Sequence, residues 1–319
     1  MPDHEMHVCT GRANRPLAEA VARELGRELL PVSIAQFPDS EIHVLIEALV
    51  RHQDIYIIQP CSTPVNDNLM ELVMMIDAFR RASAHAINVI MPYFPYARQD
   101  RMARGREAIS AKVVARMIQL MGATRVVYVD IHAKATQGFF DIPVDPLTAL
   151  PVLVERFRGD EFTNAAIVSP DVGRGWLANQ YARQLDLPLA VMYKRRTEEG
   201  GVQVMDIAGD IFGRTPIIID DVIASGSVLT QVPALIRAGA RPPAYLAITH
   251  PVLLPQAVKR LDSDLIAELV VTDTINVPED RQHPKLRILS IAPLLAEAIR
   301  RIHEGESIGP LVEGTWHIG

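Results

Sequence analysis

The chain has 319 residues, of which 49% are hydrophobic, and its formal net charge at pH 7 is −6. This apolar content excludes a disordered chain, the length predicts two domains, and the acidic balance gives no argument for binding nucleic acid. The two cysteines, Cys9 and Cys61, favour a reducing compartment over a disulfide framework. The N-terminus lacks the apolar segment of a signal peptide, and no apolar run approaches the ~18 residues of a membrane span. We therefore expect a cytoplasmic protein that binds neither membrane nor nucleic acid.

Short apolar runs alternate with longer amphipathic segments along the chain. The predicted strands are Asp54–Gln59, Ala86–Met91, Arg125–Ile131, Ala165–Ser169, Leu189–Met192, Pro216–Ile219, Tyr245–Ile248 and Glu268–Thr272. Between the first two strands a helix begins that Asn66 and Asp67 can cap, and Ser110–Met121 is a second helix, ended by Gly122. This alternation predicts an α/β fold with mainly parallel sheets flanked by helices.

Two features indicate how the chain is divided. Three prolines interrupt the periodicity between Pro143 and Pro151, which is typical of a domain boundary. Residues 81–92 resemble residues 237–251, and each segment follows a strand, a loop and a helix. The similarity is explained either by two copies of one α/β unit or by the small residues that joints between helices and strands commonly contain.

The most informative stretch is an apolar run that ends in Asp220 and Asp221 and continues into a loop containing Ser225, Gly226 and Ser227. Glycine and serine in such a loop let backbone N–H groups hold a phosphate, and carboxylates at the end of a parallel strand meet the ligand. The pattern therefore indicates a sugar phosphate. The alternative is an ordinary strand, turn and helix without a ligand. In either case, Pro233 should kink the helix after Ser227 or delay its start.

Two loops combine aromatic rings with charges. The segment from Phe94 to Arg101 contains Arg98, Gln99 and Asp100, and guanidinium groups of this kind bind phosphate oxygens. A turn earlier in the chain offers the ring and carboxylates of Phe37, Asp39 and Glu41, which could hold a base. The alternatives are a solvated charged loop for the first segment, and a hydrophobic staple with a helix cap for the second.

Further polar residues follow other predicted strands. His132 and Asp171 lie at the ends of neighbouring predicted strands and could hold Mg²⁺ directly or through water, together with substrate phosphates. A single histidine is, however, more often structural. Lys194 and Arg196 belong to a run of three cations that leads into a polar, glycine-containing segment. Such a run is usually a solvated face, but beside phosphates it could close over a transferring group.

In this order, these segments resemble the ribose-phosphate pyrophosphokinase family over nearly the whole chain. The resemblance also rests on the segments 66–72 (NDNLMEL), 109–112 (ISAK), 137–145 (QGFFDIPVD) and 295–301 (LAEAIRR). It implies two similar phosphoribosyltransferase-type domains, at 1–147 and 148–302, with a tail from about residue 303 to 319 that packs back on the first domain. It also implies a homo-oligomer built from dimers, commonly a hexamer, with ATP bound across a subunit interface.

The resemblance implies transfer of the diphosphoryl group of Mg-ATP to the 1-hydroxyl of ribose 5-phosphate, giving 5-phosphoribosyl 1-diphosphate and AMP for nucleotide biosynthesis. Position by position, it implies ATP binding by Phe37, Asp39, Glu41, Arg98, Gln99 and Asp100; Mg²⁺ binding by His132 and Asp171; catalysis by Lys194 and Arg196; and ribose 5-phosphate binding by Asp220, Asp221, Ser225, Gly226 and Ser227. This division suits a phosphoryl transfer, in which alignment and charge neutralisation supply most of the catalysis.

The chain departs from the family pattern at several positions. The sugar-phosphate loop is shorter, with Ala224 where an acidic residue is common. After Asp171 the family pattern has a Gly-Gly pair followed by a basic residue, whereas this chain has Gly173, Arg174 and Gly175, and then Trp176 where small or basic residues are usual. Lys134 and Ala135 stand where the family has other small or polar residues, which puts its phosphate and ADP regulatory site in doubt. Two alternatives therefore stand beside the synthetase: a non-catalytic regulatory paralogue, and a type I phosphoribosyltransferase.

Overall fold

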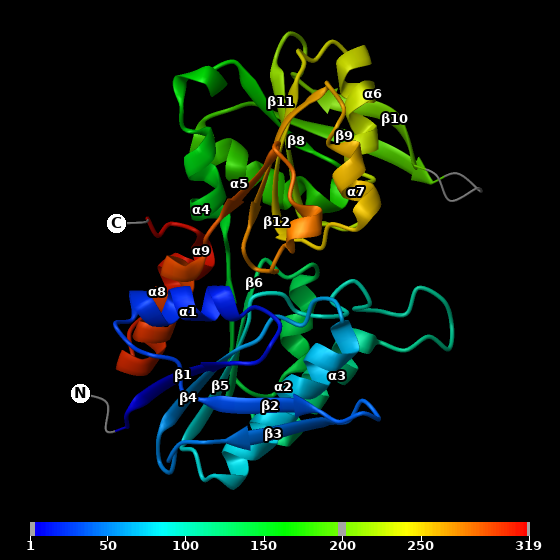
Figure 1. Cartoon of the computed structure of the whole chain (residues 1–319). Coiled ribbons are helices and arrows are strands. Elements are labelled where there is room, and N and C mark those ends of the chain that lie inside the picture. Colours follow the sequence, from blue (N-terminus) through cyan, green and yellow to red (C-terminus); the bar gives the residue numbers. More distant parts are fainter. Residues whose placement is uncertain (1–3, 197–201, 318–319) are drawn as a thin grey trace. The chain divides into compact units, whose positions relative to one another are not determined.

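The structure is a computed structural model that describes residues 4–196 and 202–317 (Figure 1). The chain divides into two compact units, the first formed by residues 1–148, 274–276 and 291–319 and the second by residues 149–273 and 277–290. The sequence placed the boundary one residue earlier and let the tail return from about residue 303. In the structure the return begins at Ile291, so that the helix Ala292–Glu304 belongs to the first unit.

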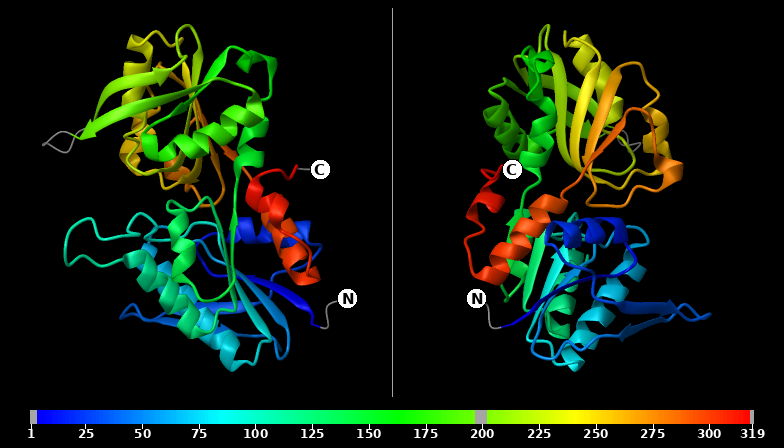
Figure 2. Two further views of the ribbon diagram at one scale, coloured as in Figure 1. Left: turned by 180° about the vertical axis from the view of Figure 1, so that it is seen from behind. Right: turned by 60° about the vertical axis from the view of Figure 1, so that its left-hand side comes forward.

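A parallel sheet of strand order β1-β4-β5-β6-β7 forms the centre of the first unit, and an antiparallel hairpin, β2–β3, stands apart from it. The strands are β1 (Met6–Thr10), β2 (Val32–Gln36), β3 (Ile42–Ile46), β4 (Asp54–Ile58), β5 (Ala86–Met91), β6 (Arg125–Val129) and β7 (Val144–Leu147). The helices are α1 (Arg15–Glu24), α2 (Val65–Arg81), α3 (Ser110–Met121), the 3-10 helix η1 (Lys134–Phe139), α8 (Ala292–Glu304) and α9 (Gly309–Glu313). Helices α2 and α3 cover one face of the sheet, and α1 and α8 cover the other (Figures 1 and 2).

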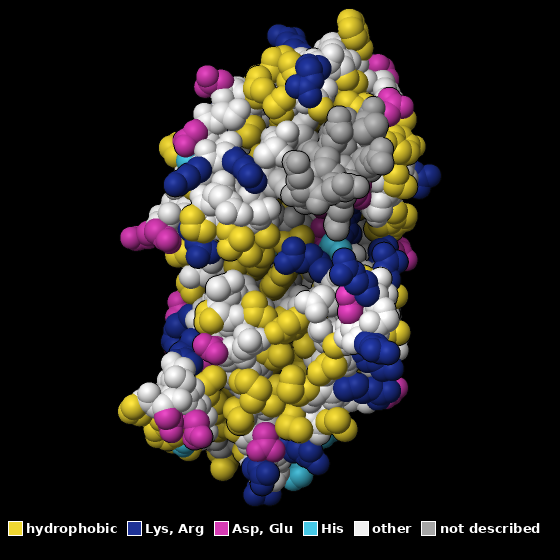
Figure 3. Space-filling model, turned by 90° about the vertical axis from the view of Figure 1, so that its right-hand side faces the viewer, with side chains coloured by type: hydrophobic (Ala, Val, Ile, Leu, Met, Phe, Trp, Pro, Cys, Tyr) yellow, Lys and Arg dark blue, Asp and Glu magenta, His cyan; other side chains and the backbone are white. Residues whose placement is uncertain are grey.

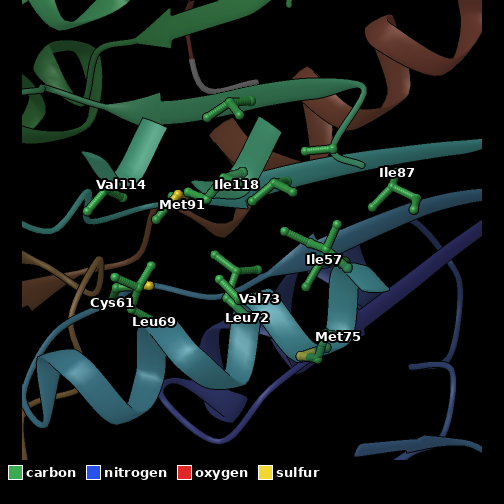
Figure 4. Close-up of a cluster of buried hydrophobic side chains, with 14 of the residues drawn as sticks. Ile57, Cys61, Leu69, Leu72, Val73, Met75, Ile87, Met91, Val114 and Ile118 are labelled. Carbon is green, nitrogen blue, oxygen red and sulfur yellow. The ribbon is translucent and has the colours of Figure 1, made fainter. Parts of the chain in front are cut away.

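The core beneath α2 and α3 explains why these segments are helical. Apolar residues recur at helical spacing on α2, and Leu69, Leu72 and Val73 point toward strand residues such as Ile57 (Figure 4). The end of α3 is as predicted, since Gly122 takes φ +124° at its C-cap. The start of α2 was predicted wrongly: Pro64 occupies the N-cap position, so that Asn66 and Asp67 lie within the first turn.

In the described part of the second unit, a sheet of strand order β10-β9-β8-β11-β12-β13-β14 is parallel except for the pair β9–β10. The strands are β8 (Ala165–Ser169), β9 (Leu189–Arg196), β10 (Val202–Gly209), β11 (Thr215–Ile223), β12 (Ala244–Pro251), β13 (Ile266–Thr272) and β14 (Leu286–Leu289). The helices are α4 (Leu150–Val154), η2 (Glu155–Phe157), η3 (Asp160–Phe162), η4 (Val172–Arg174), α5 (Gly175–Leu185), η5 (Leu229–Gln231), α6 (Val232–Arg237), α7 (Pro255–Arg260) and η6 (Glu279–Arg281), where η marks a 3-10 helix.

The two repeated segments of the sequence occupy corresponding places in the two units. The first joins α2 to β5, which pairs in parallel with β4, and the second joins α6 to β12, which pairs in parallel with β11. This topology favours two copies of one α/β unit over chance similarity of joints. The predicted α/β class with mainly parallel sheets is confirmed. Within residues 4–196 and 202–317, no helix is long and apolar enough to cross a membrane.

Candidate active site

The adjacent carboxylates Asp220 and Asp221 lie within β11, the central strand of the second unit. This strand extends to Ile223, beyond the predicted end at Ile219. Its neighbour β8 pairs with it only as far as Ile218, whereas β12 follows it to its end. The two carboxylates therefore lie where one neighbouring strand has already stopped. Ligands bind at such carboxyl ends in open parallel sheets.

Residues of α7 contact the loop that follows β11 and restrict its conformation. The carbonyl oxygen of Ser225 accepts a hydrogen bond from Nη1 of Arg260 at 2.6 Å, and those of Gly226 and Ser227 accept from backbone N–H groups of the next turn at 3.0 and 3.2 Å. Gly226 has φ +74°, and a Cβ atom there would lie 2.9 Å from Cα of Ala257. A phosphate cradle requires carbonyl oxygens that face the protein, because they repel phosphate, and this loop meets that requirement.

The helix after this loop begins late, which is one of the two effects predicted for Pro233. A 3-10 turn, Leu229–Gln231, comes first, and α6 starts only at Val232 with Pro233 in its first turn. The proline explains the delay, since it lacks an N–H group and is tolerated only at the start of a helix. The loop therefore offers its own backbone N–H groups, and not the dipole of a long helix, to an anion.

Asp171 and Arg174 connect the end of β8 to the carboxylates of β11. Asp171 caps η4, because its Oδ1 accepts a hydrogen bond from the backbone N–H of Arg174 at 3.1 Å. The guanidinium of Arg174 reaches both carboxylates, with Nε 3.5 Å from Oδ1 of Asp220 and Nη2 3.1 Å from Oδ2 of Asp221. Burial, and then the negative charge of Asp221, raise the pKa of the Asp220 carboxyl well above its usual range, while Arg174 opposes this shift.

On the first unit, the loop that carries Arg98, Gln99 and Asp100 follows β5. Its start is anchored in the core by Phe94, which is 2% exposed. Gln99 also holds the start of α3, because its carbonyl oxygen accepts from the backbone N–H of Ala111 at 3.2 Å and its side chain accepts from the hydroxyl of Ser110 at 2.7 Å. Arg98 is exposed at the carboxyl end of the sheet. An anchored loop that presents a guanidinium is able to bind phosphate, which a wholly solvated loop would do poorly.

Phe37, Asp39 and Glu41 lie together at the tip of the β2–β3 hairpin. The backbone N–H of Phe37 donates to the carbonyl of Glu41 at 2.8 Å, and Oδ1 of Asp39 accepts from the backbone N–H of Glu41 at 3.2 Å. The ring of Phe37 is 50% exposed. A strand and not a helix follows this turn, so the alternative of a staple and helix cap is wrong.

The two predicted metal ligands were expected at the ends of neighbouring strands, and this expectation was wrong. His132 follows β6 of the first unit, whereas Asp171 follows β8 of the second, and these strands belong to different sheets. No cluster of three or more possible metal-ligating side chains occurs among the described residues. Mg²⁺ often binds proteins through one or two carboxylates, with water and substrate phosphates completing its shell, so a single carboxylate such as that of Asp171 fits this ion.

Lys194 and Arg196 form the end of β9, which pairs with β10 beyond the gap in the described chain. Their side chains lie outside what the structure describes. Within the second unit, the structure brings Asp220 and Asp221 together with Arg174, which the sequence marked only as a departure. It also brings Arg260, which the sequence did not single out, to the carbonyl oxygen of Ser225 in the loop. The only signal for Arg174 was its place three residues after Asp171, just beyond a predicted strand. Arg260 donates a hydrogen bond to a backbone carbonyl, and no sequence pattern reveals such a contact.

Comparison with known proteins identifies the family. Residues 6–122 match the model of the N-terminal domain of ribose phosphate pyrophosphokinase, residues 152–242 the phosphoribosyl transferase domain, and residues 201–313 the phosphoribosyl synthetase-associated domain. The ribose-phosphate pyrophosphokinase of Bacillus caldolyticus is 43% identical over 97% of this chain and 98% of its own length. The chain belongs to the ribose-phosphate pyrophosphokinase family.

Two further relatives support this membership. Ribose-phosphate pyrophosphokinase 2 of Enterococcus faecalis is 46% identical over 98% of this chain and 97% of its own length. The crystal structure of phosphoribosylpyrophosphate synthetase from Mycobacterium smegmatis is 39% identical, covers 94% of this chain and 99% of that one, and superposes with a TM-score of 0.89. The resemblance seen in the sequence is thus confirmed, and so is the fold that ribose-phosphate pyrophosphokinases imply.

Proposed function

We propose that this chain transfers the diphosphoryl group of Mg-ATP to the 1-hydroxyl of ribose 5-phosphate, giving 5-phosphoribosyl 1-diphosphate and AMP. The proposal rests on membership of the ribose-phosphate pyrophosphokinase family over nearly the whole chain. One structural observation carries the proposal. Two adjacent carboxylates of β11 precede a loop whose carbonyl oxygens accept hydrogen bonds from neighbouring groups of the protein, such as the guanidinium of Arg260. Carboxylates accept hydrogen bonds from sugar hydroxyls, and the backbone N–H groups of such a loop donate hydrogen bonds to a phosphate.

Each group of residues has a distinct task in this reaction. Asp220 and Asp221 hold the ribose hydroxyls, while the backbone of Ser225, Gly226 and Ser227 holds the 5-phosphate. Together they fix the sugar at two points, and a sugar held in this way presents its 1-hydroxyl in a single orientation. Fixing both reactants in this manner supplies much of the acceleration in phosphoryl transfer.

On the nucleotide side, Arg98, Gln99 and Asp100 bind the phosphates of ATP, and the hairpin residues bind its base. Phe37 stacks on adenine, and the carboxylates of Asp39 and Glu41 accept hydrogen bonds from its amino group. The exposure of these three side chains at the hairpin tip supports contact with a ligand held by another subunit. The anchored backbone of the loop after β5 supports the role of Arg98.

In the transfer step, the oxygen of the 1-hydroxyl forms a bond to the β-phosphorus, the bond from that phosphorus to the α,β-bridging oxygen breaks, and AMP leaves. The proton of the 1-hydroxyl passes to solvent water. Lys194 and Arg196 stabilise the negative charge on the transferring group. Asp171 on the second unit and His132 on the first would each hold Mg²⁺ that is bound to the phosphates, and the ion would supply further positive charge there.

The direct test is to incubate the purified protein with Mg-ATP and ribose 5-phosphate and to follow the release of AMP. We expect AMP and 5-phosphoribosyl 1-diphosphate in equal amounts, and no AMP when ribose 5-phosphate is left out. Binding of ATP without AMP release would instead indicate a non-catalytic paralogue. Consumption of 5-phosphoribosyl 1-diphosphate and a free nucleobase would indicate a phosphoribosyltransferase.

We further propose that the chain forms a homo-oligomer built from dimers. A stripe of exposed apolar side chains on α2 and α3 supports this: Met70, Met74, Val113 and Leu120 are 39, 41, 58 and 68% exposed. Hydrophobic side chains gather on this face of the first unit (Figure 3). Contiguous exposed apolar surface commonly marks a protein interface. Sedimentation velocity tests the idea: Leu120→Glu should lower the sedimentation coefficient, whereas the matched change Leu49→Glu, at a residue 89% exposed outside the stripe, should not.

The cytoplasmic location also remains a proposal. Cys9 and Cys61 are both free and buried, which supports a protein made in a reducing compartment. Burial raises the pKa of both thiols, so neither is a reactive thiolate at neutral pH. Their role is therefore that of small apolar residues in the core of the first unit.

A further inference from the structure

The guanidinium of Arg174 bridges the two carboxylates that the proposed function assigns to the ribose hydroxyls. Its side chain is 16% exposed, and those of Asp220 and Asp221 are 19 and 4% exposed. The backbone of Arg174 is held in turn by Asp171, whose main-chain oxygen and side chain both accept from its N–H group, at 3.2 and 3.1 Å. The cation is thus built into the fold at the end of β8, and its reach to β11 does not depend on a flexible loop.

Two adjacent carboxylates shielded from water repel each other, and they require a nearby positive charge to bind a second anion. Ribose 5-phosphate brings such an anion, because its phosphate is negatively charged at neutral pH. Its hydroxyls also need carboxylate oxygens that are available as acceptors. A single cation that touches both carboxylates meets both needs, since it offsets their charge without occupying all of their oxygens.

We propose that Arg174 is a positioning residue that supplies the counter-charge of the ribose carboxylates, so that this site binds ribose 5-phosphate without a divalent cation. The proposal rests on the function inferred above for Asp220 and Asp221. It differs from that function in assigning the charge balance of the sugar site to a side chain of the protein.

The test is isothermal titration calorimetry with ribose 5-phosphate, in EDTA and in Mg²⁺, on the full-length protein. For the unmodified protein we expect affinities that differ by less than about threefold between the two conditions, because linkage between the sugar and the metal is then weak. For Arg174→Gln we expect the affinity in EDTA to fall by about tenfold or more and to be largely restored by Mg²⁺. Arg174→Lys, which keeps a cation, should retain most of the affinity in EDTA.

The control is Arg183→Gln, which removes an exposed arginine from α5, the helix that begins beside Arg174. It should leave both affinities unchanged, and circular dichroism of every variant shows whether the fold is retained. Equal loss of affinity in EDTA and Mg²⁺ for Arg174→Gln would overturn the proposal, since it would indicate a merely structural role, as would no loss at all. Failure of the unmodified protein to bind ribose 5-phosphate in either condition would overturn the proposed function as well, and thus separates the two ideas.

Discussion

The substitution Gly226→Ala tests whether the sugar-phosphate loop is held in one conformation by α7. Gly226 has φ +74°, a region in which an alanine costs about 1–2 kcal/mol. A methyl group at this position would also lie 2.9 Å from Cα and 3.0 Å from Cβ of Ala257. Overpacking of this kind costs about 1–3 kcal/mol more. The total strain is therefore about 2–5 kcal/mol.

A matched variant separates the two contributions. Gly213 lies in the same unit and has φ +69°, but a methyl group added there would have no heavy atom within 4 Å. Gly213→Ala should therefore show only the backbone cost of about 1–2 kcal/mol. Both substitutions lower the entropy of the unfolded chain alike, so this effect cancels in the comparison. The difference between the variants reports the contact with Ala257 alone.

The strain can be released in two measurable ways. If the loop keeps its conformation, urea unfolding should show Gly226→Ala to be about 1–3 kcal/mol less stable than Gly213→Ala. If the loop moves instead, calorimetry should show weaker binding of ribose 5-phosphate, by tenfold for each ~1.4 kcal/mol released. A Gly226→Ala variant with the stability of Gly213→Ala and undiminished affinity for ribose 5-phosphate would refute the reasoning.

Three further changes should have distinct effects. Lys194→Ala should lower turnover by about 10²-fold or more, with little change in the KM for ATP, because it removes charge stabilisation from the transition state; unchanged turnover removes this lysine from the mechanism. Arg260→Ala should raise the KM for ribose 5-phosphate about tenfold and leave that for ATP unchanged, since the carbonyl of Ser225 loses its 2.6 Å hydrogen bond; equal changes in both would contradict a local role. Hydrogen bonds from Arg300 lower the pKa of Glu297 to about 2. The ionised carboxylate therefore contributes its full stability at a pH above the unfolded-state pKa of about 4.5. This contribution decreases as the pH falls from 4.5 toward 2. The deficit in the unfolding free energy of Glu297→Gln should thus be larger at pH 7 than at pH 4, and a deficit independent of pH would contradict this origin.

Sequence patterns predicted well the elements whose stability comes from local spacing. The helix Ser110–Met121 and the strand Ala165–Ser169 have the predicted bounds, because apolar residues at helical spacing, a C-terminal glycine and a short buried run are local signals. The hairpin at Phe37 was not recognised as a hairpin, and β11 was ended too early at Ile219. Both errors arise from pairing between strands, which depends on residues distant in the sequence.

Candidate site residues could be proposed from the sequence one by one, but the contacts between them could not. The sequence identified Asp220 and Asp221 from their place after an apolar run. It could not reveal that Arg174 reaches both carboxylates, because that contact depends on the packing of β8 against β11. The contact of Arg260 with the loop depends in the same way on where α7 returns to β11. Long-range packing of this kind is set by the tertiary fold and leaves no periodic signal.

One departure on the sugar side changes the charge of the site. Ala224 stands where the family pattern commonly has an acidic residue, whereas Arg174, which contacts Asp220 and Asp221, lies in a segment where that pattern also has a basic residue. Compared with the family pattern, the site is therefore more positive by about one charge, and this charge attracts the sugar phosphate but repels a divalent cation. Ala224→Asp should therefore weaken the binding of ribose 5-phosphate in EDTA and make it more dependent on Mg²⁺, as Arg174→Gln should. Ala224→Asn introduces a side chain of nearly the same size as aspartate but without its charge. This variant should bind ribose 5-phosphate as the unmodified protein does. If Ala224→Asp and Ala224→Asn bind ribose 5-phosphate equally in EDTA, the charge at residue 224 does not affect binding. The departure at this position must then be explained by the shape of the shortened loop alone.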